Sequence, residues 1–173
     1  MVNIETETVS ENREKTSARL YVYLLLFRGE EGSEEVFLIE RANTSFQDGM
    51  LTPPAGRLEP GETPSEAARR EGFEEAGVDI QPENLRFEQV LMRPAYNRTG
   101  PGYDHTKTSW LDFTFSTRVW DGEPFNAETD RAASAGWHRV DQLPENMLPG
   151  VRSFLKNYPN HEPYAATGFG NDN

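Results

Sequence analysis

The stretch 56–78, GRLEPGETPSEAARREGFEEAGV, constrains what this chain can fold into more than any other part of it. Thr63 and Glu66 have the spacing of a capping box, and Pro64 falls at the first helical position. Gly77 suits the left-handed residue that commonly ends a helix. These signals predict a helix that begins just after a glycine-rich loop and ends just before Gly77.

Three carboxylates gather on one face of this predicted helix. Glu71, Glu74 and Glu75 are related by i, i+3 and i+4, so their Cβ atoms lie about 5–6 Å apart. Such a cluster costs helix stability unless a cation neutralises it, and Mg²⁺ held by carboxylates and substrate phosphates is a usual arrangement. The ordinary alternative is a solvated charged face. Arg70 has two candidate partners, Glu62 in the preceding loop and Glu74 one turn further on.

The overall charge restricts the class of ligand. The chain has 173 residues, of which 17 are basic and 29 acidic, giving a formal net charge of −12. This balance argues against a broad basic surface that would bind long nucleic acid. A small phosphate-bearing ligand remains compatible, because a metal ion can bridge an acidic site and a phosphate.

Cysteine and membrane signals are missing from the sequence. Without cysteine, disulfides, thiolate metal sites and cysteine nucleophiles are excluded. The longest apolar run, at 20–27, is eight residues long. A membrane-spanning helix needs about 20. The first residues contain no apolar signal core. We therefore expect a cytoplasmic protein with no membrane contact.

Apolar runs and turn residues predict the remaining elements. We expect a second helix, and strands before and after the first helix. This order predicts an α+β fold in which a mixed sheet carries helices on its faces. The strands are expected at 18–28, 36–41, 85–93, 108–120 and 136–140, and the second helix at 150–158.

The 56–78 stretch resembles the Nudix box, G-x5-E-x7-R-E-U-x-E-E-x-G-U, where U is a bulky apolar residue. One position departs from the pattern, because Gly72 stands where an aliphatic side chain is expected. We expect Phe73 to take over that packing against the sheet. The residues in register are Gly56, Glu62, Arg70, Glu71, Glu74, Glu75, Gly77 and Val78.

The resemblance extends over residues 18–158 and implies the α/β/α sandwich of Nudix hydrolases, with MutT-like enzymes as relatives. Residues 1–17 are then a polar N-terminal tail or an added strand. Residues 159–173 are expected to be a C-terminal tail. The chain would form one domain.

The resemblance implies a Mg²⁺-dependent hydrolase, with Mn²⁺ as a substitute, that cleaves the pyrophosphate of a nucleoside diphosphate linked to a group X. An NTP, a dNTP or a modified nucleotide is favoured as the small nucleotide-like substrate. Pyrophosphatases of ADP-ribose, nucleotide sugars or dinucleoside polyphosphates are the alternative. Two non-enzymatic alternatives are a nucleotide-sensing module and an acidic metal-binding domain. A homodimer is an open option.

The resemblance also implies roles for particular residues. The metal ligands would be Glu74, Glu75 and the carbonyl oxygen of Ala55, and Glu71 would be a ligand or the general base. Arg70 belongs to the same catalytic group. A distant loop would supply a further acidic ligand, Glu128, with Glu123 and Asp130 as nearby rivals.

Substrate contacts are harder to place, because substrate choice in this family lies outside the box. Arg57 in the box loop is a candidate contact to phosphate, or else part of a surface ion pair. The long loop at 94–107 is a candidate specificity loop, although mobile surface loops are more common. The candidates for contacts to the base or phosphate are Phe46, Tyr96, Arg98, Tyr103, His105 and Asn146.

Overall fold

The computed structural model describes residues 17–30, 32–44, 47–94, 108–158 and 160–168. Its elements, in chain order, are β1 Ser17–Arg28, β2 Glu35–Arg41, β3 Leu51–Thr52, β4 Ala55–Arg57, α1 Pro64–Ala76, η1 Pro82–Asn84, β5 Arg86–Pro94, β6 Thr108–Thr117, β7 Ala132–Arg139, η2 Val140–Gln142, α2 Pro149–Lys156 and β8 Tyr164–Ala166.

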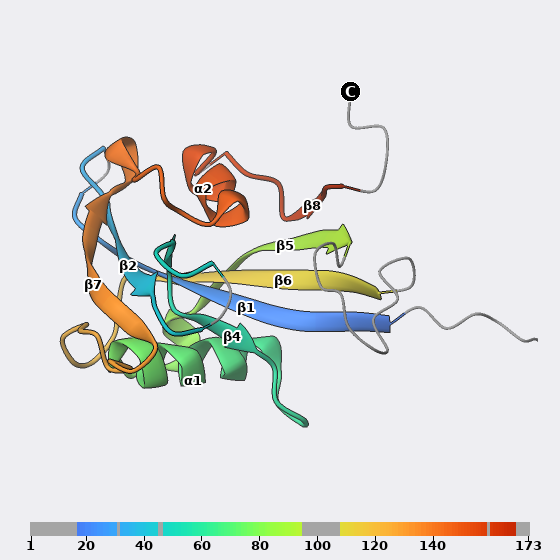
Figure 1. The fold of residues 1–173 in the computed structure, drawn as a ribbon, viewed down its shortest axis with the longest axis horizontal. Helices are drawn as coiled ribbons and strands as arrows, with labels where there is room; N and C mark the ends of the chain where they lie inside the picture. Colours follow the sequence, from blue (N-terminus) through green and yellow to red (C-terminus); the bar gives the residue numbers. More distant parts are fainter. Residues whose placement is uncertain (1–16, 31, 45–46, 95–107, 159, 169–173) are drawn as a thin grey trace, which may run out of the picture.

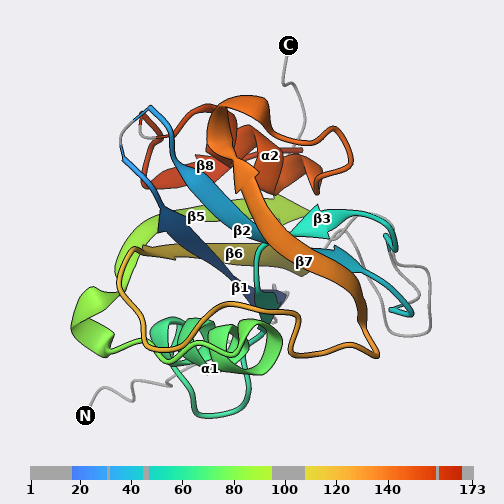
Figure 2. The same cartoon turned by 90° about the vertical axis from the view of Figure 1, so that its left-hand side faces the viewer.

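Strand β1 is the centre of a mixed sheet. It runs parallel to β6 and antiparallel to β4, and its last residues pair antiparallel with β2. Strand β5 lies antiparallel to β6 and parallel to β8, while β3 and β7 both pair with β2. Figures 1 and 2 show α1 and α2 on opposite sides of the strands. The predicted mixed sheet with helices on both faces is confirmed.

The continuous apolar stretch of β1 follows from this layering, because a strand covered on both faces is apolar on both faces. Val22, Leu24 and Leu26 pack into the core that contains the alanines of α1. Leu25 and Phe27 point the other way, into a second core that contains the apolar face of α2. Alternate residues of one strand thus hold a helix on each side of the sheet.

Helix α1 has the ends that the sequence predicts. The Thr63 hydroxyl accepts a hydrogen bond from the Glu66 amide at 3.3 Å, and the Glu66 carboxylate accepts one from the Thr63 amide at 2.8 Å. Gly77 ends the helix with a φ of 70°, which only glycine adopts without strain. The capping box and the glycine stop are therefore both confirmed.

The expected packing of Phe73 is wrong. Its side chain is 66% exposed, on the outer surface of α1. Gly72 is buried instead, and a Cβ placed on it would lie 2.6 Å from Leu24 Cδ2 and 3.4 Å from Ile80 Cδ1. The space that an aliphatic residue normally fills is thus occupied by side chains from β1 and from the segment after α1.

Other boundaries differ from the expected ones by a few residues. The strand expected at 136–140 begins earlier, at Ala132, because pairing with β2 compensates for a small-residue stretch that has little intrinsic strand preference. Within the expected tail 159–173, residues Tyr164–Ala166 form strand β8 against β5. In the described part of the chain, no helix is both long enough and apolar enough to cross a membrane.

Candidate active site

Strand β4 lies against the carboxylate face of α1. A Cβ on Gly56 would lie 1.8 Å from Oε1 of Glu71, so only glycine lets the strand backbone approach that carboxylate so closely. Glu71 is only 7% exposed as a result. Burial raises the pKa of Glu71, although hydrogen bonding from Arg70 opposes the rise.

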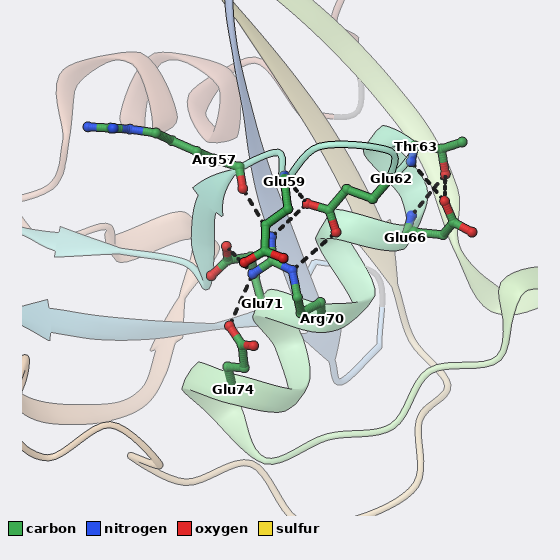
Figure 3. A network of polar contacts seen from close by, with 8 residues as sticks. All are labelled: Arg57, Glu59, Glu62, Thr63, Glu66, Arg70, Glu71 and Glu74. Atoms are coloured by element: carbon green, nitrogen blue, oxygen red, sulfur yellow. Dashed lines mark hydrogen bonds and ion pairs between the residues drawn. The ribbon is translucent and has the colours of Figure 1, made fainter.

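Arg70 connects the loop to the helix (Figure 3). Its guanidinium contacts Glu62 through two nitrogens, at 2.8 and 3.1 Å, and donates at 3.0 Å to the carbonyl oxygen of Arg57. The same group contacts Glu71 at 2.7 Å and Glu74 at 3.0 Å. Arg70 therefore binds both of its candidate partners, Glu62 and Glu74, at the same time.

Glu75 is the most perturbed carboxylate of this group. Its Oε2 accepts a hydrogen bond from the Ala55 amide at 2.9 Å. Burial raises the pKa of Glu75 to about 8; the Ala55 amide works against the rise, while the negative charges of Glu71 and Glu128 add to it. Burial and the neighbouring negative charges thus outweigh the Ala55 amide and the charge of Arg41, which both lower the pKa of Glu75.

Glu128 reaches this cluster because its loop is pinned to the end of α1. The amides of Phe125 and Ala127 each donate at 3.2 Å, to the carbonyl oxygens of Ala76 and Glu75. Glu128 faces the same cavity as the α1 carboxylates. The other two candidates for the acidic ligand from this loop, Glu123 and Asp130, are not among the residues that line this cavity.

The cavity has a volume of about 920 Å³ and extends from the carboxylates across the α2 face of the sheet. Its floor contains an ion pair between the buried Asp112 and the partly exposed Arg93, with Arg93 Nε 2.5 Å from Oδ2 of Asp112. Burial raises the pKa of Asp112, and Arg93 opposes that rise. Tyr21 lies between the two regions, and its hydroxyl is 3.4 Å from the Ala55 carbonyl oxygen. Five guanidinium groups line the cavity: Arg41, Arg57, Arg70, Arg93 and Arg131.

The chain that forms this cavity matches a known family. The model of the NUDIX domain matches residues 18–158. The chain belongs to the NUDIX family. Members of this family typically use a divalent metal ion.

Two Nudix relatives have names that describe their substrates. The chain is 36% identical to the human 8-oxo-dGDP phosphatase NUDT18 over 129 residues, which cover 75% of this chain and 33% of that protein. It is 31% identical to the 8-oxo-dGTP diphosphatase of Escherichia coli K12 over 110 residues, covering 64% of this chain and 74% of that protein. The chain thus spans about a third of the length of the human relative.

The Nudix fold is also found among solved structures. A MutT NUDIX hydrolase from Burkholderia pseudomallei superposes with a TM-score of 0.64 at 21% identity, covering 82% of this chain and 98% of that chain. At this level of identity the likeness concerns the fold alone.

The cavity brings together most of the residues that the sequence singled out. Ala55, Arg57, Arg70, Glu71, Glu74, Glu75 and Glu128 all line the cavity. Asn146 does not, because its side chain donates to the carbonyl oxygen of Gly49 at 2.9 Å. The other candidates, Phe46, Tyr96, Arg98, Tyr103 and His105, lie outside the described residues.

Several residues that line the cavity were not predicted from the sequence as site residues, among them Tyr21, Arg93 and Asp112, which lie in segments that the sequence predicts only as strands. Asp112 carried a signal, since a carboxylate in the middle of the apolar strand TSWLDFTFST needs a partner when it is buried.

Proposed function

We propose that this chain is a divalent-metal-dependent hydrolase that cleaves the pyrophosphate of a nucleoside diphosphate linked to a group X. Mg²⁺ is the proposed ion, with Mn²⁺ as a substitute. The observation that carries the proposal is the partly buried Glu75, whose pKa is raised beside Glu71 and Glu128, in a cavity that guanidinium groups also line. Carboxylates without enough cations bind a metal ion, and guanidinium groups bind phosphate.

The donor atoms fit a hard cation. Glu71, Glu74, Glu75 and Glu128 would supply carboxylate oxygens, and Ala55 a carbonyl oxygen, with no sulfur or imidazole among them. As they stand, no three acidic or imidazole side chains of the described residues are arranged to hold an ion, since Arg70 holds Glu71 and Glu74. When bound, the ion would neutralise phosphate charge and lower the pKa of a water molecule.

The side chains of the chain itself would orient the substrate. Arg57 and Arg131 would contact phosphate oxygens, and Arg70 would keep the loop with Glu62 in place against α1. A water would attack one phosphorus of the pyrophosphate, and the bridging oxygen would leave with the other phosphoryl group. Glu71 would act as a ligand or accept the proton of this water.

The favoured group X is the terminal phosphate of an NTP, a dNTP or a modified nucleotide. The two named relatives act on 8-oxo-dGDP and 8-oxo-dGTP, and these names support a nucleotide with a modified base. The Asp112–Arg93 pair offers polar groups that a base could contact. ADP-ribose, nucleotide sugars and dinucleoside polyphosphates are the competing substrates.

The test is a substrate panel with Mg²⁺ or Mn²⁺, reading out orthophosphate, pyrophosphate and nucleoside monophosphate. The panel contains canonical and 8-oxo nucleoside di- and triphosphates, ADP-ribose, NADH, nucleotide sugars and dinucleoside polyphosphates. We expect turnover of at least one nucleotide, and a fall of at least ~10²-fold in kcat for Glu75→Gln. Glu83→Gln, in the exposed turn η1, is the matched control and should keep full activity.

Two results would contradict the proposal. If no substrate of the panel were turned over, the protein would be either a nucleotide-sensing module or a metal-binding domain. Titrating nucleotide with and without metal distinguishes these two alternatives. A fully active Glu75→Gln would remove Glu75 from the proposed ligands.

A further inference from the structure

The C-terminal segment 160–168 is attached to the far edge of the sheet by its backbone. The amide of Val90 donates to the carbonyl oxygen of Pro163 at 2.9 Å, and the amide of Thr167 donates to that of Met92 at 3.0 Å. Between these two bonds, β8 pairs in parallel with β5. Three residues of parallel pairing at a sheet edge are a weak attachment on their own.

A buried polar contact reinforces this attachment. Nε2 of His161 lies 3.1 Å from Oε2 of Glu88 and 3.2 Å from the carbonyl oxygen of Glu88. The side chain of Glu88 is almost wholly buried, and its other oxygen accepts a hydrogen bond from Ser116 at 2.5 Å. Arg86 lies 3.5 Å from that same oxygen. The C-terminal segment thus contacts the Glu88 side chain through His161.

The ring of His161 also contacts helix α2. It stacks on Tyr158, with ring planes 10° apart and centroids separated by 5.7 Å, and its centroid lies 4.5 Å from that of Phe154. The side chain of His161 therefore joins β5, through Glu88, to Phe154 of α2 and to Tyr158 just after that helix, and it belongs to the segment that leads to β8. We call the pair Glu88–His161 the clasp.

The elements that the clasp joins also form a wall of the proposed substrate cavity. Phe154, which packs on His161, lines the cavity, and so does Thr167 of the segment. Gln89, the neighbour of Glu88, lines it as well and donates at 2.7 Å to the carbonyl oxygen of Glu162. The carboxylates belong to α1 and its adjoining loops, on the other side of the strands from α2 (Figure 1).

We propose that Glu88 and His161 are positioning residues that hold segment 160–168 as a wall of the substrate cavity, so that this segment helps to select the group that the cavity accepts. The inference rests on the proposed function for its substrate, and it assigns a role to a part of the chain outside the Nudix box. Because the wall and the carboxylates come from different elements, loosening the clasp should weaken substrate binding and leave the chemical step intact.

The main test replaces His161 by Phe, which keeps a ring against Tyr158 and Phe154 but removes the polar contact. Hydrogen exchange at the Val90 and Thr167 amides should become about tenfold faster or more, while exchange in α1 stays unchanged. With the best substrate of the panel, KM should rise about tenfold and kcat should stay within about twofold. His161→Gln places an amide nitrogen where Nε2 was, and should restore both values.

The matched control is His138→Gln, which removes a histidine from β7 instead. It should change neither the exchange of the Val90 and Thr167 amides nor KM. If His161→Phe left the hydrogen exchange of these amides unchanged, the clasp would not hold the segment. If exchange became faster but KM stayed unchanged, the segment would not act as a wall of the substrate cavity.

A second variant covers the case in which His161→Phe unfolds. Thr167→Trp adds bulk to the wall without touching the clasp, and should raise KM for substrates with a large group X more than for nucleoside triphosphates. Equal KM changes for all substrates would overturn the proposal. If the wild-type protein turns over no substrate, the proposed function fails, and the exchange experiment still decides whether the clasp holds the segment.

Discussion

The carboxylate of Glu75 accepts a hydrogen bond from the backbone amide of Ala55 at 2.9 Å, which ties the last turn of α1 to the start of β4. The bond fixes one oxygen of Glu75 against the backbone of Ala55. The carboxylate is thereby held in place before any ligand arrives, among the like charges of Glu71 and Glu128. A rigid group of oxygen donors avoids the ordering cost that flexible side chains would add to binding.

The raised pKa of Glu75 predicts how the stability of the metal-free protein depends on pH. The pKa is about 8 in the folded protein and 4.5 as the ordinary value, so folding favours the protonated form. The stabilisation is complete below pH 4.5 and is lost as pH rises through 8. Because of this one group, the free energy of unfolding should fall by a few kcal/mol over that interval, on the order given by linkage.

Urea unfolding with a chelator at pH 5, 7 and 9 measures this effect. Subtracting the curve of Glu75→Gln, which stays neutral, isolates Glu75 from other titrating groups. Divalent metal at pH 8 should stabilise the wild-type protein and not the variant, because a ligand of the folded state raises stability by mass action. Parallel pH profiles for the two proteins would contradict the prediction.

Replacing Arg70 by Lys should damage both the loop and the reaction. The guanidinium bridges Glu62, Glu71 and Glu74 at once, and an ammonium group cannot reproduce that fork. We expect a loss of about 1–3 kcal/mol in unfolding free energy and at least ~10-fold in kcat/KM. Urea unfolding and steady-state kinetics measure the two effects.

Arg139→Lys is the matched control for Arg70→Lys, because Arg139 pairs with Asp141 at the surface. It should change stability by less than about 0.5 kcal/mol. If Arg70→Lys behaved like this control, the bridge would have no role in holding the loop.

The loop at 121–131 allows a comparison of two acidic residues a few positions apart. Glu128 lines the cavity and Glu123 does not. Glu128→Gln should therefore raise the Mg²⁺ concentration needed for half-maximal activity by ~10-fold or more, whereas Glu123→Gln should leave it unchanged. Metal titrations of activity decide the point, and equal effects of the two substitutions would reject Glu128 as the loop's ligand.

Restoring the usual aliphatic residue at position 72 should destabilise this particular chain. The site is filled by Leu24, and even a Cβ would approach its Cδ2 to 2.6 Å. Gly72→Ile should cost about 1–3 kcal/mol by overpacking, although it removes a glycine from a helix. Gly136→Ala, where a Cβ meets nothing within 4 Å, is the control.

Urea unfolding compares these two variants. The double variant with Gly72→Ile and Leu24→Ala should lose less stability than the sum of the two single losses, because the isoleucine fills space that Leu24 leaves. A Gly72→Ile protein as stable as the wild type would show that the packing adjusts freely.

Local signals in the sequence were enough to predict α1 and the polar contacts around it. Thr63, Glu66 and Gly77 act within a few residues of the helix ends, so their effect does not depend on the rest of the fold. The partners of Arg70 follow from helical spacing and a short loop. The prediction that Phe73 packs on the sheet was wrong, because the burial of a helical side chain depends on which side of the helix faces the sheet.

Contacts between distant segments could not be predicted in the same way. Glu128 reaches Glu75 through backbone hydrogen bonds from its loop to the end of α1, and no sequence pattern encodes them. Asp112 and Arg93 meet because β5 and β6 pair in one register, and a shift by one residue would turn either side chain to the other face. The same holds for His161, which reaches Glu88 only because β8 joins the edge of the sheet.

The sequence by itself determined the helix that carries three glutamates, the glycine that ends it and the acidic, cysteine-free character of the chain. These depend on hydrogen bonds and charges between residues that are near each other in the chain. The tertiary structure alone decided which carboxylates face one cavity, what forms the floor of that cavity and where the C-terminal segment lies. Burial and register depend on the packing of segments far apart in sequence, and the high pKa of Glu75 comes first from that burial.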